Sequence, residues 1–427
     1  MKKKLVSMVL ATVMTASLAA CGETTAPTTG GQTATTDNGG STAAASDVKI
    51  GVILVGDENE GYTYAHIDGI KKAAANVGIS EDNILWKYSV PEDESCYEAA
   101  VDLVDQGCKA VFSNSYGHQS FMQQAAGDFA DVQFVAMTGD TAAMSGLSNF
   151  SNAFTNVYES RYVSGVVAGM KVAELVENGA LSDANYDADG KVLIGYVGAY
   201  PYAEVVSGYT AFFLGVQSIY KDVSMEVTYT NSWFDIAAEG EAANALMADG
   251  CVIIGQHADS TGAPAAIQAA NAQGKPVYSV GYNVDMLSVA PDAALTSATN
   301  NWSVYYTDAF NAVVSGQKIP TDWSKGYADD AVAITALGAS AAEGTQAKVD
   351  EVIAAIKDGS LHVFSTDSFT VGGSKLDSHK VDMNGDFDNE DEEDKEAIWD
   401  GYFHESELRA APSFDLRIDG IKELTAE

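Results

Sequence analysis

The sequence has few basic residues for its size. Its 427 residues include 23 lysines and arginines against 60 aspartates and glutamates, which gives a formal net charge of −37 at pH 7. Nucleic acids and anionic lipid surfaces are bound through basic patches, so this charge balance argues against both as partners. Solubility on an exposed surface is enough to explain so acidic a chain.

Long hydrophobic runs are missing except at the start of the chain. Residues 1–21 are MKKKLVSMVLATVMTASLAAC, with three lysines, an apolar stretch over 5–18 and two alanines before Cys21. The apolar stretch is too short to span a bilayer as a helix. The segment resembles a lipoprotein signal peptide with the lipobox LAAC, which implies that Cys21 is lipidated. An ordinary secretory signal peptide is the alternative.

Large aliphatic and aromatic side chains are absent from residues 22–46, GETTAPTTGGQTATTDNGGSTAAAS. Such a segment cannot bury enough surface to offset the entropy lost on ordering. We therefore expect a flexible tether that holds the folded body close to a membrane face.

Cysteines and catalytic motifs are scarce as well. Besides Cys21 the chain has Cys96, Cys108 and Cys251, an odd number whose spacing fits no metal site. Cys108 and Cys251 each follow a glycine at a predicted strand start, so we expect them to be small buried side chains.

No serine elbow, phosphate loop or metal-spaced cluster accompanies the histidines His66, His118 and His257. Asp259 and Ser260 follow His257 closely, but three residues on one turn cannot readily align as base, orienter and nucleophile. We expect neither catalysis nor a cofactor, and His257 is better explained as a hydrogen-bonding partner of a ligand or as a cap of the turn.

What the chain does contain is a regular alternation of short apolar strands and amphipathic helices from residue 48 onward. The predicted strands are continuous apolar runs, which is typical of parallel sheets buried on both faces. The pattern restarts near residue 158, which favours two doubly wound α/β lobes over one very wide sheet. The strands are VKIGVILV, ILWKYS, KAVFS, VQFVAM, KVLIGYV, SMEVTYT, CVIIGQ and PVYSV, and the helices cover 62–77, 158–177, 204–220, 235–248 and 260–272.

Aromatic and short polar residues follow nearly every predicted strand. In open parallel sheets ligands bind beyond the carboxyl ends of the strands, so two facing lobes would enclose a ligand in a cleft. Small-molecule pockets combine flat apolar faces with a few polar groups, and this mixture recurs in GDENEGYTYAHIDG, NSYGHQ, TGD, GAYPYAE, NSWFD, QHADSTG, GYNVDM and TSATNNW. Any one of these residues alone would more often belong to the core or the rim.

The order and spacing of these motifs resemble the basic membrane lipoprotein family of substrate-binding proteins. Its best-known members are purine nucleoside receptors that supply ABC transporters. The resemblance runs from about residue 48 to about residue 306, and the tail DGYFHESELRAAPSFDLRIDG is similar to a longer branch of the family. It is carried by GYTYAHIDG, NVYESRYVSGVVAG, IGYVGAYPYAEVVSGYTAFFLG, NSWFDIAAEGEAANALMADG, QHADSTG, GYNVDM and LTSATNNW.

The resemblance implies that one aromatic ring from each lobe sandwiches a purine. Tyr62 matches the position after the first strand, and Trp233, two residues before Asp235, matches the second. By that match Trp233 is a wall of the binding site rather than a core residue, and Phe234 is the better candidate for the core.

The sequence departs from the family at three positions. Thr63 replaces an asparagine, Asn283 stands where an aspartate holds the ribose hydroxyls, and Asn300 replaces a lysine that accompanies that aspartate. The sequence lacks both the aspartate and the lysine, which is physically consistent because either charge would be costly if it were buried alone. A free purine base therefore remains open beside a nucleoside, and a sugar is a further alternative because aromatic rings also stack on pyranoses. The polar candidates around the ligand are Asp57, Ser115, Asp140, Asp235, His257, Asp259, Asn283, Asp285 and Asn300.

We expect a type I periplasmic-binding-protein fold, two α/β lobes joined by three hinge crossings near 153–158, 281–285 and 317–325. Lobe one would hold 48–155 plus 284–318, lobe two 156–282 plus 319–344, and 345–427 would be a C-terminal extension. The resemblance implies a monomer, anchored by lipid on the extracytoplasmic face, that delivers its ligand to an ABC permease and its ATPase. A ligand sensor or adhesin without transport is the other possibility.

The acidic stretch DMNGDFDNEDEED gives a weak candidate for a calcium loop. Asp382, Asn384, Asp386, Asp388 and Glu393 occupy the spacing of calcium ligands, but Phe387 stands where the loop requires glycine. A solvated acidic loop is the favoured interpretation.

Overall fold

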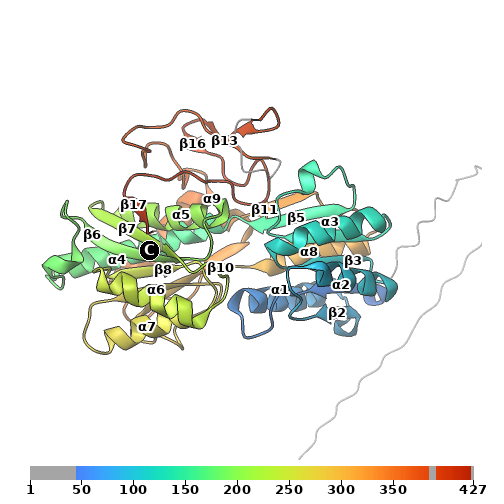
Figure 1. The fold of residues 1–427 in the computed structure, drawn as a ribbon, viewed down its shortest axis with the longest axis horizontal. Helices are drawn as coiled ribbons and strands as arrows, with labels where there is room; N and C mark the ends of the chain where they lie inside the picture. The colour runs from blue at the N-terminus through green and yellow to red at the C-terminus, as the bar shows by residue number, and fades with distance from the viewer. Residues whose placement is uncertain (1–44, 384–390, 425–427) are drawn as a thin grey trace, which may run out of the picture. The chain divides into compact units, whose positions relative to one another are not determined.

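The computed structural model describes residues 45–383 and 391–424. Two sheets, each flanked by helices, form the main body within these ranges (Figure 1). The predicted signal peptide and Cys21 lie outside the described residues, as does nearly all of the predicted tether. Of the tether only residues 45 and 46 are described, in a short 3₁₀ helix, Ala45–Asp47.

The first sheet, which defines lobe one, has the strand order β11-β5-β4-β3-β1-β2 with every pair parallel. Its strands are β1 (Ile50–Ile53), β2 (Ile84–Lys87), β3 (Ala110–Ser113), β4 (Gln133–Met137), β5 (Phe150–Thr155) and β11 (Asp322–Lys325). Its helices are α1 (Gly61–Val77), α2 (Glu94–Asp105), α3 (Gln119–Asp128) and α8 (Trp302–Val314).

The second sheet, which defines lobe two, has the order β12-β10-β9-β8-β6-β7-β17 and is parallel except for β12 against β10. Its strands are β6 (Val192–Gly198), β7 (Val223–Tyr229), β8 (Ile253–Gln256), β9 (Tyr278–Tyr282), β10 (Ala294–Asn300), β12 (Val332–Ile334) and β17 (Ile421–Glu423). Its helices are α4 (Val157–Glu177), α5 (Ala203–Ile219), α6 (Ile236–Ala248), α7 (Gly262–Asn271) and α9 (Thr345–Lys357).

The central strands are apolar because both of their faces are covered by helices. Every residue of β1, β3, β6 and β8 is buried. The predicted α/β fold with two parallel sheets is therefore confirmed. The eight expected strands and five expected helices are all present, each within a few residues of its predicted bounds.

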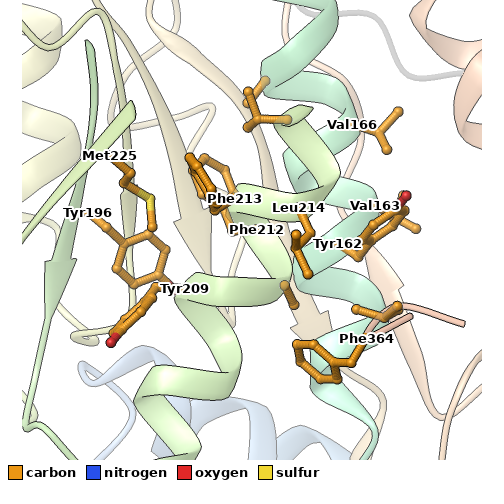
Figure 2. Packing of buried hydrophobic residues seen from close by; sticks show 14 of the residues in the cluster. Tyr162, Val163, Val166, Tyr196, Tyr209, Phe212, Phe213, Leu214, Met225 and Phe364 are labelled. Carbon is orange, nitrogen blue, oxygen red and sulfur yellow. The ribbon is translucent and has the colours of Figure 1, made fainter. Parts of the chain in front are cut away.

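The core of lobe two depends on the close approach of α4 and α5. Figure 2 shows Tyr162, Val163 and Val166 of α4 packed beside Phe212, Phe213 and Leu214 of α5. Gly165 permits this, because a Cβ there would lie 2.1 Å from the carbonyl oxygen of Phe212.

The division of the chain between the lobes differs from the predicted one after residue 282. Strand β10 pairs with β9, so it belongs to lobe two, and the chain crosses to lobe one only at Asn301. Strand β11 then pairs with β5 in lobe one, and the return crossing lies between β11 and β12. The expected assignment of 284–318 to lobe one and 319–344 to lobe two is thus corrected for β10 and β11. Strand β10, ALTSATN, lacks the valine and isoleucine run of β1, β6 and β8.

The C-terminal extension is folded onto lobe two rather than separate from it. Two small hairpins, β13 (Lys380–Val381) with β14 (Lys395–Glu396) and β15 (Ile398–Trp399) with β16 (Tyr402–Phe403), precede β17. Phe364, Phe369 and Phe414 pack into the same apolar cluster as α4 and α5. Strand β17 pairs with β7 at the edge of the lobe-two sheet.

Two smaller expectations concern burial. Cys96, Cys108 and Cys251 are free thiols and all three are buried, which confirms the interpretation of Cys108 and Cys251. Within residues 45–383 and 391–424, no helix combines the length and the apolar character that crossing a membrane requires.

Candidate functional site

A cavity of about 710 Å³ lies at the carboxyl ends of strands from both sheets. Lobe one contributes the residues after β1, β3 and β4, and lobe two those after β6, β7 and β8. Parallel strands place their carboxyl ends on one edge, which explains why segments distant in the chain meet here. Seven predicted site residues line the cavity: Asp57, Tyr62, Ser115, Asp140, Trp233, His257 and Asp259.

The aromatic ring of the lobe-one wall is held in place by its own contacts. Tyr62, in the first turn of α1, donates its hydroxyl proton to the carbonyl oxygen of Asn114 at 2.5 Å. Its ring meets His66 edge to face with 4.5 Å between centroids. The backbone of Thr138, also on this wall, has φ of 63°, a conformation that a β-branched residue rarely adopts. The contacts of Tyr62 with Asn114 and His66 therefore hold its ring in a fixed position at the cavity.

The lobe-two wall is a cluster of aromatic rings. Trp233 meets Tyr200 edge to face at 5.0 Å between centroids, and Tyr200 stacks on Tyr202 at 5.2 Å. Tyr202 in turn lies 5.9 Å from Tyr116 of lobe one, so ring contacts extend across the cavity. These are the flat apolar faces that a planar ligand requires.

Carboxyl groups surround these rings, and two of them are buried. Burial raises the pKa of Asp259 well above its usual range, and the nearby carboxyls of Glu60 and Glu239 raise it further, against the hydrogen bond from Asn283. Burial also raises the pKa of Glu60, which accepts a short hydrogen bond from Thr63. Protonated carboxyls at these positions could donate to a ligand as well as accept from it.

His257 lines the cavity and is buried, with its Nε2 atom 2.8 Å from a carboxylate oxygen of Glu204. Burial lowers the pKa of His257, although Glu204 partly opposes this by favouring the charged ring. A neutral ring would therefore donate from Nε2 to Glu204 and leave Nδ1 as an acceptor.

Asn283 and Asn300 do not line the cavity but support a residue that does. The side-chain amide of Asn283 donates to Asp259 at 2.7 Å, and that of Asn300 donates to Asn283 at 3.1 Å. Thr155 completes the chain by donating to Asn300. The two asparagines thus orient Asp259 and have no direct access to the cavity.

Two further predicted site residues lie away from the cavity. Asp235 is exposed and caps the N-terminus of α6, where its Oδ1 atom accepts from the backbone N–H groups of Ala237 and Ala238. Asp285 is exposed and accepts from the backbone N–H of Leu287. Both carboxylates satisfy backbone donors at local turns.

Phe234 corrects the expectation that it would belong to the core. Its side chain is 38% exposed and lines the cavity, whereas neighbouring Trp233 is half-buried and packs against the lobe-two cluster. Asn231, with φ of 55°, turns the chain just before this pair. Both aromatics therefore face the cavity region, and neither is a core plug.

Several lining residues were not among the sequence candidates. Most belong to the same strand-end motifs, which mark the right segments without telling which side chain faces the ligand. Glu92 lies outside these motifs, and the family resemblance of the C-terminal tail did not indicate that its residues reach the cavity. The missed residues include Glu60, Glu92, Tyr116, Tyr200, Tyr202, Glu204, Tyr282, Arg409 and Arg417.

The calcium-loop candidate receives no support from the described part of the chain. No group of three or more histidine, cysteine or acidic side chains within it could hold a metal ion. Asn384, Asp386 and Asp388 lie outside the described residues, and Asp382 lines the ligand cavity instead.

Two sheet lobes with a cavity at the carboxyl ends of their parallel strands form the fold of periplasmic-type solute-binding proteins. Solved structures agree on the fold. An ABC transporter solute-binding protein from Aeropyrum pernix K1 superposes with a TM-score of 0.61 at 15% identity, covering 74% of this chain and 93% of that one. One from Conexibacter woesei gives 0.56 at 19% identity, covering 74% and 98%.

The sequence identifies the family. The model of the Bmp family, described as PnrA-like ABC transporter substrate-binding proteins, matches residues 47–360. The chain belongs to this family.

Two relatives are named for different ligands. A purine-binding protein of Brucella abortus is 34% identical over 274 residues, which is 64% of this chain and 71% of that protein. A putative ABC transporter glucose-binding protein of Haloferax volcanii is 30% identical over 257 residues, 60% of this chain and 58% of that one.

Proposed function

We propose that this substrate-binding protein captures a purine nucleoside or free purine base in its interlobe cavity for an ABC importer, without catalysis. The observation that carries the proposal is the pair of aromatic walls, Tyr62 on lobe one and the Trp233 cluster on lobe two. A purine offers two π-faces to such walls, and base–aromatic stacking contributes about 1–3 kcal/mol per base. The resemblance to a purine-binding relative supports the same ligand class.

In this proposal the polar groups of the cavity orient the ring. Asp57, Ser115, Asp140, His257 and Asp259 face the ligand directly. Asn283 and Asn300 act through Asp259, and Asp235 and Asp285 have only local structural roles. The ligand's N–H and O–H groups therefore meet several carboxyl acceptors.

The N-terminal sequence supports delivery at a membrane. We infer that Cys21 carries a lipid anchor, that the body works as a monomer on the extracytoplasmic face, and that it passes ligand to a permease and its ATPase. Mass spectrometry of the N-terminal peptide of the cell-derived protein tests the anchor. A peptide starting at Cys21 without a lipid mass would contradict it.

A sugar is the second candidate, because aromatic rings also stack on pyranoses and one relative is named as a putative glucose-binding protein. A thermal-shift panel of adenine, hypoxanthine, adenosine, inosine, glucose and galactose distinguishes the two. A ligand at a hundred times its Kd stabilises the fold by about 2.7 kcal/mol. Purines, and not sugars, should raise the melting temperature.

Substitutions at the walls test the stacking itself. Tyr62→Ala and Trp233→Ala should each weaken purine binding by a factor of about 5 to 150, as the loss of one stacked face predicts. Tyr64→Ala is the matched control, because Tyr64 lies in the same turn of α1 but is 48% exposed and outside the cavity lining. If sugars alone shift the melt, the purine proposal is wrong. If both wall variants bind purines normally, the proposed stacking on Tyr62 and Trp233 is wrong.

A further inference from the structure

The C-terminal extension forms a third wall of the ligand cavity. The family match ends at residue 360, yet residues 409–417 contribute to the lining of the same cavity as Tyr62 and Trp233. This segment is attached to both lobes. The backbone N–H of Ala410 donates to Asp322 of lobe one at 3.0 Å, and β17 joins the lobe-two sheet.

The two lobes by themselves would give the cavity acidic side chains and no lysine or arginine, as far as the described residues show. The lobes contribute six carboxyls, namely Asp57, Glu60, Glu92, Asp140, Glu204 and Asp259. The extension adds Arg409 and Arg417, together with Asp382 and Asp415. The permanently cationic hydrogen-bond donors of the lining therefore all come from the extension.

The choice of arginine over lysine is specific to this cavity. Among 23 basic residues only three are arginines. Two of them, Arg409 and Arg417, line the cavity, and the third, Arg161, lies with its guanidinium carbon 3.6 Å from the ring centroid of cavity residue Tyr282. Arginine differs from lysine by a rigid planar fork of donors that suits two adjacent acceptors on one planar edge.

Arg409 is the better placed of the two lining arginines. It is only 8% exposed, its Nη1 atom donates to the carbonyl oxygen of Asp382, and it lies 3.9 Å from Asp140 of lobe one. Its Nε atom is buried and has no hydrogen-bond partner among the described residues. Arg417 is more exposed, and its Nε atom is paired with Glu423 at 3.0 Å.

We propose that Arg409 makes the cavity selective for 6-oxopurines over 6-aminopurines. The inference rests on the purine assignment above and adds which purine. A 6-oxopurine presents two neighbouring acceptors, O6 and N7, to which an arginine fork binds in a bidentate manner. A 6-aminopurine replaces O6 with an amino donor, which faces a donor across that contact. The carboxyls of the lobes then accept from the N–H groups on the rest of the ring.

Isothermal titration of the full-length mature protein with hypoxanthine and adenine, and with inosine and adenosine, tests this. Wild-type protein should bind the 6-oxo member of each pair about tenfold or more tightly, within the range expected for one bidentate contact. Arg409→Gln should reduce that ratio to within about threefold while adenine affinity stays within about threefold of wild type. Arg409→Lys keeps the charge beside Asp140 and Asp382 but loses the fork, so it should also lose most of the preference.

Thermal melts without ligand show whether each variant is folded. If Arg409→Gln does not fold, Arg409→Lys alone tests the proposal. Lys422→Gln is the control for removing a cation from the extension, because Lys422 lies outside the cavity lining and pairs with Glu226 at 3.0 Å, and it should keep the preference. A wild-type ratio near one, or an equal loss for both purine types in the folded Arg409 variants, would overturn the role of Arg409 while leaving the purine assignment intact. Failure of all four purines to bind would overturn the purine assignment itself.

Discussion

At the scale of single residues, two aspartates near the cavity show that the role of an acidic side chain depends on where it lies. Asp235 and Asp259 are both strand-end aspartates, but the first caps a helix in solvent and the second is buried against Asn283. Glu239 connects the two places, because it accepts from the backbone N–H groups of Asp235 and of Ser260. Its ionisation therefore affects the loop that carries His257 and Asp259.

Glu239 should make the stability of the protein decrease with rising pH. Burial raises its pKa from 4.5 to about 7, so the folded state holds a proton that the unfolded chain has already released. The stabilisation is complete below pH 4.5 and is lost as pH rises through 7. Between about pH 5 and 8.5 the free energy of unfolding of Glu239→Gln should rise by about 2 kcal/mol relative to wild type.

Urea denaturation at the two pH values measures this difference. Glu241→Gln, an exposed position on the same helix, is the control for removing a carboxylate from α6. Burial raises the pKa of Glu405 to about 8, so Glu405 also makes stability decrease with rising pH. This residue is present in wild type, Glu239→Gln and Glu241→Gln alike. Parallel pH dependence in wild type and Glu239→Gln would contradict the assignment.

At the scale of elements, the packing of α4 against α5 depends on glycine at the crossing. Gly165 and Gly215 each have a partner backbone oxygen at 2.1 Å from where a Cβ would be, Phe212 for one and Tyr162 for the other. Side chains on either side of the crossing, Tyr162 and Phe212 among them, fill the space around it (Figure 2). No rotamer change can relieve such a clash, because the obstructing atoms are backbone.

Gly165→Ala should therefore destabilise the protein although alanine favours helices. Forcing the two helices apart costs about 1–3 kcal/mol, more than the gain in helix propensity of up to about 1 kcal/mol. Gly127→Ala in α3 is the matched control, because a Cβ there has no neighbour within 4 Å and should be neutral or stabilising. Urea denaturation of the two variants would show opposite signs, and equal effects would refute the close-approach argument.

At the scale of the whole molecule, the lobes are joined by more than the hinge. The chain passes between them at Asn156, at Asn301 and between β11 and β12, and the extension adds a further link through Ala410 and β17. Ala410 also packs with Phe154 and Tyr282 in a small apolar cluster that draws on both lobes. Closure of the two lobes around a ligand would have to occur about this hinge region, because the cavity opens between the lobes.

We expect the radius of gyration to fall when the cavity is filled, since a ligand that touches both walls favours the closed arrangement. Small-angle scattering with the purine that gives the largest melting shift measures the change. Trp233→Ala at the same purine concentration should show a smaller fall in the radius of gyration, because less of it is bound. A radius that does not change in saturated wild-type protein would mean that capture does not depend on closure.

The sequence by itself determined the class of fold and the location of the interlobe cavity. Buried parallel strands need apolar residues along their whole length, so runs such as KVLIGYV predict these strands from the local sequence alone. The polar and aromatic segments after those strands follow from the same geometry, which is why Asp57, Tyr62 and Trp233 could be placed at the cavity. The family motifs then limited the ligand class.

Only the tertiary structure decided which lobe holds β10 and β11, which side chains line the cavity, and where the extension packs. Sheet membership depends on backbone pairing between distant segments, and ALTSATN carries no periodic signal of its own partner. Asn283 and Asn300, which the family resemblance placed among the ligand contacts, bond to Asp259 and to each other. Arg409 lies beyond the matched residues 47–360 and reaches the cavity because the extension folds back onto it, a long-range contact that local sequence does not encode.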